Sequence, residues 1–286
     1  MIDEARVAQE ATSRPLLDAD EPAPVSVAKA GAAAPFLLVC DHAGAATPRR
    51  LARLGLAEPV FATHIAVDIG AADLALRMSE TLGATLISQT YSRLVIDCNR
   101  AVGHPQSIVG VSDGVEIPGN AGLDAADGQA RVEAIHRPYH ARISREIDER
   151  QSRGQPTVLV CVHSFTPVMG GVSRPWHVGV LHGGASPISD AMLWRLKAED
   201  GLVVGDNEPY AMDGTDFTAP FHAWARGLDV VELEVRQDLL ADAKEQARLA
   251  TLLGRSLTLA REDALESRSA APARLTPLGR GAEPEA

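Results

Sequence analysis

The chain has 286 residues, of which 45% are hydrophobic and 23% charged, proportions that are ordinary for a globular protein. This length is enough for one large α/β domain or two small ones. The formal net charge of −11 argues against non-specific binding of nucleic acid, because such binding depends on Lys and Arg that neutralise phosphates. A small anionic substrate is compatible with this charge, since local arginines can override the overall sign.

The N-terminal stretch MIDEARVAQEATSRP is polar and acidic, so we do not expect a signal peptide. No apolar run approaches the ~18 residues of a membrane span, and we expect no membrane partner. The cysteines Cys40, Cys98 and Cys161 lie in or beside apolar runs and form no CxxC pair. We therefore expect buried free thiols in a cytoplasmic protein.

Composition divides the chain into three parts. Residues 1–34 are rich in Ala, Pro and acidic residues, and residues 266–286 have a similar character. We expect the first segment to be disordered or loosely packed and the second to be a disordered tail. Residues 35–265 are then a single α/β domain.

The first half of this domain begins with an apolar run at 36–41 that predicts a strand. A helix is expected at 68–83, followed by strands at 84–89 and 93–97. The Gly- and Asp-rich stretch 103–128 predicts a long loop, and loops of this length are usually functional or mobile.

The second half continues the alternation of helices and strands. Apolar residues at helical spacing predict a long amphipathic helix at 129–153, in which Pro138 predicts a kink or an earlier end. We expect the remaining strands at 157–162, 177–182, 202–205 and 229–235, and helices at 187–200 and 241–263. The pattern predicts a mostly parallel sheet, covered on both faces, that binds its ligand at the carboxyl ends of the strands.

Two buried strands are expected to end in polar side chains. FLLVCDHAG ends in Asp41-His42, and TVLVCVHSF ends in His163-Ser164. Two imidazoles, one carboxylate and a water are the ligands of a hydrolytic zinc site, in which the metal polarises a carbonyl and lowers the pKa of water to about 7. We expect His42 and His163 to bind a divalent metal; two histidines that bond locally are the alternative.

The third ligand is less defined by the sequence. Asp68 begins the helix after the first strand, and we expect it to be a ligand, with a helix N-cap as the alternative. Asp41 is a candidate to orient the neighbouring imidazole, and His64 is also close in sequence. A nucleophilic role for Ser164 is a weaker alternative.

The stretch VVELEVRQDLL places Glu232, Glu234 and Arg236 on one face of a strand. Buried charge needs a partner or a metal, although an edge strand with a wet face is the alternative. We expect Glu234, near the strand end, to act as a general base, and Arg236 to bind a carboxylate or pair with a charge.

Two further stretches carry candidate residues. SRLVIDCNR contains Arg93, Asn99 and Arg100, which we expect to bind a substrate carboxylate, with surface ion pairs as the alternative. IHRPYH places His136 and His140 four residues apart, but HExxH is absent. We expect His140 to line the site or form hydrogen bonds there.

The order of DHAG, SRLVIDCNR, RPYH, VHSF and LEVRQDL resembles the N-formylglutamate amidohydrolase family over roughly residues 36–260. The resemblance implies a zinc-exopeptidase-like fold, a three-layer α/β/α sandwich with a mixed sheet and a metal at the strand ends. It also implies hydrolysis of the amide bond of an N-acylated amino acid such as N-formylglutamate. Ala43, where serine is common, and the EVRQDL ending imply a divergent member. The residues that match the family motifs are His42, Asp68, Arg93, Asn99, Arg100, His163 and Glu234.

Together, these observations predict a zinc-dependent amidohydrolase that acts on a small substrate bearing a carboxylate. His42, Asp68 and His163 hold the metal, Glu234 activates water, and His140 stabilises the oxyanion. A zinc carboxypeptidase-like or aspartoacylase-like enzyme, acting on another acyl amino acid or a peptide, is one alternative. A metal-free α/β protein that binds a small molecule is the other.

Overall fold

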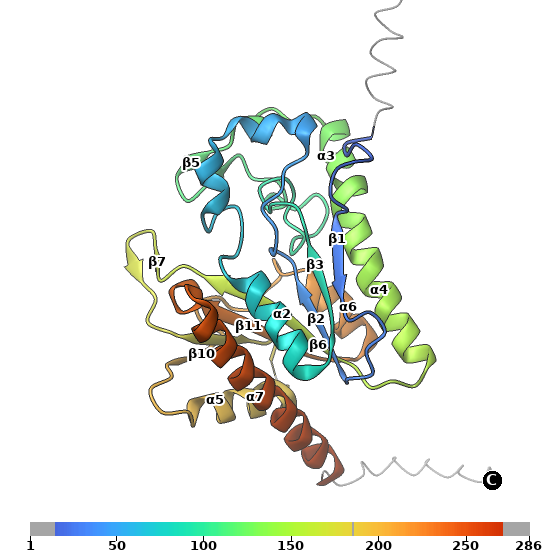
Figure 1. The fold of residues 1–286 in the computed structure, drawn as a ribbon, viewed down its shortest axis with the longest axis vertical. Helices are drawn as coiled ribbons and strands as arrows, with labels where there is room; N and C mark the ends of the chain where they lie inside the picture. The colour runs from blue at the N-terminus through green and yellow to red at the C-terminus, as the bar shows by residue number, and fades with distance from the viewer. Residues whose placement is uncertain (1–14, 185, 271–286) are drawn as a thin grey trace, which may run out of the picture.

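A seven-stranded mixed sheet lies at the centre of the computed structural model, which describes residues 15–184 and 186–270 (Figure 1). The strand order is β1-β3-β2-β6-β11-β9-β10. Strands β3, β2, β6 and β11 are parallel, β1 is antiparallel to β3, and the β9–β10 pair is antiparallel to β11. The strands are β1 (Val25–Ala28), β2 (Phe36–Cys40), β3 (Thr85–Gln89), β6 (Val158–Phe165), β9 (Val178–Leu181), β10 (Val204–Asp206) and β11 (Asp229–Arg236).

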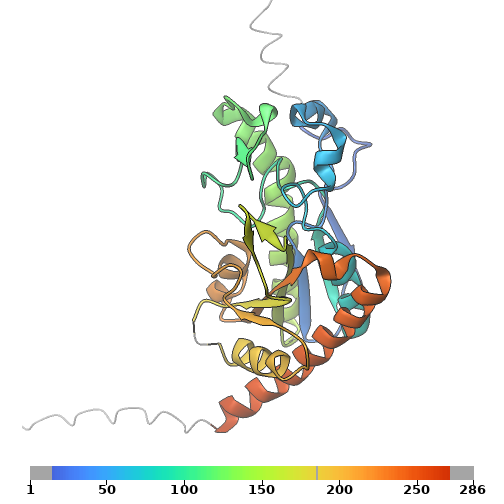
Figure 2. The ribbon, with the colours of Figure 1, turned by 90° about the vertical axis from the view of Figure 1, so that its left-hand side faces the viewer.

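Helices cover both faces of this sheet (Figures 1 and 2). One face packs on α2 (Ala71–Leu82), α5 (Pro187–Lys197) and α7 (Ala243–Ala270), and the other packs on α4 (Arg137–Ser152) and α6 (Thr218–His222). Alternate residues of β6 show why, since Val160 faces the first group and Leu159 the second. The predicted three-layer α/β/α sandwich with a mostly parallel mixed sheet is therefore confirmed.

The central strands are apolar because both of their faces are covered. Every residue of β2, β3 and β6 is buried. The parallel strands end at the same edge of the sheet, and the register between β6 and β11 places His163 opposite Glu234. Two residues predicted to carry the chemistry, His163 and Glu234, thus lie side by side near this edge.

The long helix expected at 129–153 is interrupted. The structure has α3 (Ala125–Arg131), a π-helical turn η4 (Val132–His136) and then α4. Pro138 lies in the first turn of α4, where it has no backbone N–H to donate to the preceding turn. The wider π-helical turn lies where the α-helical hydrogen bonds are broken.

The prediction of a strand at 93–97 is wrong, because residues 93–95 form a turn and residues 96–97 have no regular structure. Leu94, Val95 and Ile96 are nevertheless buried in the core beside α4. The backbone N–H of Asp97 donates to the carbonyl of Ser107, which joins this segment to the following loop. The apolar run therefore reflects burial rather than strand pairing.

The ends of the domain also differ from expectation. Strand β1 pairs with β3 inside the segment expected to be disordered or loose, and α7 continues to Ala270, into the expected tail. Residues 1–14 and 271–286 lie outside the described part of the chain. Within the described residues, no helix has the length and hydropathy needed to cross a membrane.

The long stretch 103–128 contains short elements rather than a single irregular loop. Figure 1 shows its β4–β5 hairpin and α3 beyond one end of the sheet. The short elements of the chain are β4 (Val111–Ser112), β5 (Val115–Glu116), β7 (Val168–Met169), β8 (Val172–Ser173), η1 (Arg49–Gly55), η2 (Glu58–Ala62), η3 (Pro118–Asn120), η5 (Trp224–Arg226) and η6 (Gln237–Leu240).

Candidate metal centre and active site

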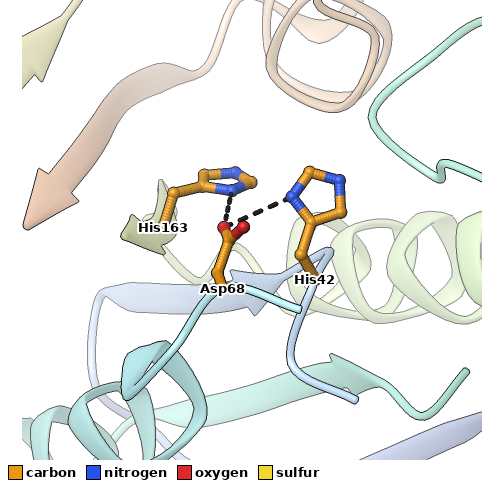
Figure 3. A group of neighbouring side chains, drawn as sticks. All are labelled: His42, Asp68 and His163. Atoms are coloured by element: carbon orange, nitrogen blue, oxygen red, sulfur yellow. Dashed lines mark hydrogen bonds and ion pairs between the residues drawn. The ribbon is translucent and has the colours of Figure 1, made fainter. Parts of the chain in front are cut away.

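Three side chains converge at the carboxyl ends of the central strands (Figure 3). His42 follows β2, Asp68 precedes α2, and His163 lies near the end of β6. One possible ligand atom from each lies within 4.8 Å of the others, and all three residues are buried. Oδ2 of Asp68 is 3.3 Å from Nδ1 of His42 and 2.9 Å from Nδ1 of His163. The structure thus brings together the three residues predicted to bind metal.

The opposite nitrogen of each imidazole faces another carboxylate. Nε2 of His42 is 2.7 Å from Oδ1 of Asp97, and Nε2 of His163 is 3.3 Å from Oδ2 of Asp41. A carboxylate favours a proton on the nitrogen that faces it. In a metal site, both rings would then present Nδ1 as the ligand atom.

The carboxylates of the cluster favour positive charge on the two imidazoles. Burial disfavours the protonated ring of His163, but Asp41 and Asp68 outweigh it and raise the pKa of His163 well above its usual value. Burial and Arg93 lower the pKa of His42. Asp97 and Asp68 outweigh both effects, so the pKa of His42 is raised. The atoms Nε2 of His163 and Oδ2 of Asp41 are buried without a well-aligned hydrogen bond. Two imidazoles and a carboxylate that converge in such a site fit the ligand set of zinc.

Asp97 was not singled out by the sequence as a partner of a metal ligand. Its second oxygen, Oδ2, accepts from Nε and Nη2 of Arg93 at 3.1 and 2.7 Å. Arg93 also reaches Oδ1 of Asp68 at 3.4 Å through Nη1. Arg93 therefore lies at the site with its guanidinium bonded to two carboxylates of the protein, and binding of a substrate carboxylate by Arg93 stays a prediction.

A cavity of about 500 Å³ opens in front of the cluster. The residues that line it include His42, Asp68, Arg93, Asp97, His163 and Glu234, together with Asn99, Arg100, Tyr210 and Asp216. Val111, Ser112 and Asp113 bring the β4–β5 hairpin to the cavity wall, and Asp113 pairs with His64 at 3.0 Å. Part of the stretch predicted to be a long loop thus borders the site.

Asn99 and Arg100, which the sequence predicts to bind a substrate carboxylate, both line this cavity. Oδ1 of Asn99 accepts from the backbone N–H groups of Phe217 and Thr218, at 3.0 and 2.9 Å. Nη1 of Arg100 donates to the carbonyl of Asn99 at 2.8 Å and approaches Asp216 at 3.5 Å. Nη2 of Arg100 has no hydrogen-bond partner within residues 15–184 and 186–270. This nitrogen is the donor that remains for a ligand.

Glu234 lines the cavity from β11. Its Oε2 is buried without a hydrogen-bond partner among the described residues, and burial raises the pKa of Glu234 to about 7. Glu232, two residues earlier, is also buried, and burial raises its pKa to about 8. A carboxyl group that titrates near neutrality beside a candidate metal centre is suited to proton transfer.

Two predicted site residues do not reach this cavity. Arg236 donates to Asp238 at 2.8 Å through Nε and to the carbonyl of Pro175 at 3.1 Å through Nη1. His140 lies behind the cavity wall, where its ring nitrogens contact His222 and the carbonyl of Cys98, both at 2.9 Å. The functions expected of Arg236 and His140 remain predictions.

The other candidates have structural partners. The hydroxyl of Ser164 donates to the carbonyl of Ile69 at 2.8 Å, next to the metal-ligand candidate Asp68. Cys40, Cys98 and Cys161 are buried and free, as predicted. Burial raises the pKa of the Cys98 and Cys161 thiols well above the usual value, so neither is a reactive thiolate.

Comparisons with known proteins agree with the architecture and with the sequence motifs. The profile of the family described as N-formylglutamate amidohydrolase matches residues 34–241. A crystal structure of a gene product from Agrobacterium tumefaciens is 40% identical, with a TM-score of 0.84, over 89% of this chain and 99% of that chain. A crystal structure of N-formylglutamate amidohydrolase from Ralstonia eutropha is 20% identical, with a TM-score of 0.59, over 86% of this chain and 100% of that chain. No curated protein matches the sequence.

Proposed function

The chain belongs to the N-formylglutamate amidohydrolase family, and we propose that it is a zinc-dependent hydrolase of the amide bond of an N-acyl amino acid, with N-formylglutamate as the first candidate substrate. The observation that carries the proposal is the convergence of Nδ1 of His42, Oδ2 of Asp68 and Nδ1 of His163. The carboxylates behind both rings support it, because metal-binding histidines usually donate their remote N–H to such a group.

His42, Asp68 and His163 would hold the metal, and zinc suits two imidazoles and one carboxylate. When bound there, a metal supplies Lewis acidity, which polarises a carbonyl and lowers the pKa of water. Arg93 would hold Asp68 and Asp97 in place, since it donates to both. This assignment makes Arg93 a positioning residue for the cluster.

Glu234 would move the proton. As a carboxylate it takes a proton from the water whose oxygen attacks the amide carbon. It then gives this proton to the amide nitrogen as the C–N bond breaks, so that the products are a carboxylic acid and a free amine. A pKa of about 7 allows the same group to accept and to donate near neutral pH.

Arg100 would bind the α-carboxylate of the substrate. Its Nη2 is the available donor, and Nη1 holds the guanidinium against the backbone of Asn99. Fixing one end of the substrate in this way sets the distance from its amide to Glu234 and the metal ligands. The proposal requires no role for His140 or Arg236.

A second candidate substrate class follows from the size of the cavity. About 500 Å³ is in the range of pockets that enclose drug-sized ligands, so an acetyl group or a short peptide also fits. The second candidate is accordingly a zinc hydrolase of the aspartoacylase or carboxypeptidase type. A panel of formylated, acetylated and peptidyl glutamate, compared by kcat/KM, separates the two candidates.

The first experiment measures zinc in the purified protein and in the His163→Ala variant, with His64→Ala, another histidine that lines the cavity, as the matched control. We expect about one zinc per chain in the wild type and in His64→Ala, and none in His163→Ala. The substrate panel is then run on the zinc-loaded protein. Equal zinc content in all three proteins, or no zinc after it is supplied, would contradict the proposed metal centre.

A further inference from the structure

A second cavity, of about 430 Å³, lies behind the wall of the catalytic cavity. It is bordered by α4, the π-helical turn before it, and the segment around α6. The residues that matter for its chemistry are Val132, His136, His140, Ser144, Phe217 and Phe221. The described residues place no acidic side chain in its lining.

The hydrogen bonds of this cavity fix which nitrogens carry protons. A carbonyl only accepts, so Nε2 of His140 donates to Cys98, and its Nδ1 accepts from Nε2 of His222. Nδ1 of His222 then accepts from the hydroxyl of Ser144 at 3.4 Å. Nε2 of His136 likewise donates to the carbonyl of Arg100 at 3.0 Å. This leaves Nδ1 of His136 as an acceptor without a partner in the described part of the chain.

The walls of the cavity are largely aromatic and neutral, and Arg137 is the charged side chain among the residues that line it. Phe217 and Phe221 stack with ring centroids 4.7 Å apart, and His140 meets Phe217 edge-on at 4.9 Å. Burial lowers the pKa of His136 and lowers that of His140 to about 3, so both rings are neutral at physiological pH. Arg137, also in the lining, is paired with Glu133 at 2.8 Å. Such walls suit a flat apolar ligand without a charge.

The two cavities share the segment 98–100 as a partition. From the second cavity, His140 donates to the carbonyl of Cys98, His136 donates to the carbonyl of Arg100, and the backbone N–H of Phe217 donates to Oδ1 of Asn99. Asn99 and Arg100 line the catalytic cavity on the other side. A ligand that orders these rings would therefore also order the two residues.

We propose that the second cavity binds a small uncharged aromatic molecule, with an N–H or O–H donor for Nδ1 of His136, and that its binding tightens the hold of Arg100 on a carboxylate in the catalytic cavity. The binding site stands on its own geometry. The coupling rests on the proposed function of Arg100. Because the two cavities share a wall, each ligand would change the affinity for the other by the same factor.

Indole is the probe for binding, because it is flat, uncharged and carries one N–H donor. We expect saturable binding of one indole per chain, measured by calorimetry. Ala141→Trp fills the cavity from an exposed position of α4 and should weaken binding at least about tenfold. Ala247→Trp, at an exposed position of α7, is the matched control and should leave binding unchanged. Absence of saturable binding, equal binding in both variants, or a preference for benzoate would overturn the site.

The coupling is measured as the affinity of the zinc-loaded protein for free glutamate, with and without saturating indole. We expect indole to tighten glutamate binding about fivefold or more in the wild type, and to have no effect in Ala141→Trp. Indole binding without this change would overturn the coupling alone. Absence of glutamate binding would contradict the role of Arg100 and the coupling with it, while the indole result would still decide the second site.

Discussion

Nε2 of His42 lies 2.7 Å from Oδ1 of Asp97, and this contact orients the other nitrogen of the ring toward Asp68. The contact joins residues that are 55 positions apart in the chain. Asp97 is itself held by Arg93 through its second oxygen. The orientation of a candidate metal ligand therefore depends on a carboxylate that does not belong to the candidate ligand set.

Asp97→Asn should weaken zinc binding about 10- to 100-fold. The amide of asparagine is a poorer acceptor for Nε2–H of His42 than the carboxylate, and it carries no charge to pair with Arg93. Competition with a chelator of known affinity measures the effect. Asp113→Asn is the control, because Asp113 lines the same cavity but pairs with His64 and not with the cluster, and this variant should bind zinc like the wild type. Equal affinity in the two variants would show that Asp97 does not act on the metal ligands.

Glu234→Gln should keep its zinc and lose activity. The amide has nearly the same shape but accepts no proton, so kcat should fall about 10²- to 10⁴-fold. Zinc content and steady-state kinetics on the same sample separate loss of metal from loss of proton transfer. Turnover near that of the wild type, with zinc bound, would mean that another group is the base.

The stability of the metal-free protein should fall as pH rises from about 6.5 to about 8. Burial raises the pKa of Glu234 to about 7 and that of Glu232 to about 8. Within this window the folded protein holds protons that the unfolded chain has released, so rising pH favours unfolding. His163, whose pKa is raised, acts in the same direction because its stabilisation is lost as it deprotonates.

His42, whose pKa is also raised, acts in the same direction, and the histidines with lowered pKa values do not oppose the fall. The pKa values of His140 and His222 are lowered to about 3 and about 4, so their contribution is complete above their unfolded values near 6.5. Thermal unfolding between these pH values tests the prediction, with Glu232→Gln expected to reduce the fall in Tm. Glu149→Gln, on the exposed side of α4, is the control. A Tm that rises with pH in the metal-free protein would contradict the titration of the buried glutamates.

Much of the fold was predictable because its signals are local. Apolar runs bounded by polar residues located β2, β6 and β11, and helix start and stop signals located α2. Two errors have a common cause, since composition and apolarity do not specify pairing. The segment around β1 is polar in composition but pairs with β3, whereas 93–97 is apolar but unpaired.

The site was predictable only in part. Polar residues after buried strands identified His42 and His163, because strand ends meet at one edge of a parallel sheet. The partner of each ring depends on distant chain segments, so the contact of Asp97 with His42 carried no local signal. His140 was assigned from its place in a motif, but its position behind the wall depends on the packing of α4 and α6.

Gly44→Ala should destabilise the protein and weaken zinc binding together. A Cβ at Gly44 would lie 1.9 Å from the backbone oxygen of Thr90, so one of the two backbones must move. Gly44 is two residues beyond His42, so we expect such a movement to shift this candidate ligand. We expect a loss of about 1–3 kcal/mol in the free energy of unfolding, as for other overpacked sites.

Gly128→Ala is the same substitution at a position with open space and serves as the control. Gly128 lies within α3, where an added Cβ would meet no atom within 4 Å. Because alanine loses less backbone entropy than glycine in a helix, this variant should be about 0.5–1 kcal/mol more stable than the wild type. Urea denaturation measures both variants, and chelator competition measures their zinc affinity. Unchanged stability and zinc affinity in Gly44→Ala would show that the backbone around Thr90 yields, and that the close approach does not fix the position of His42.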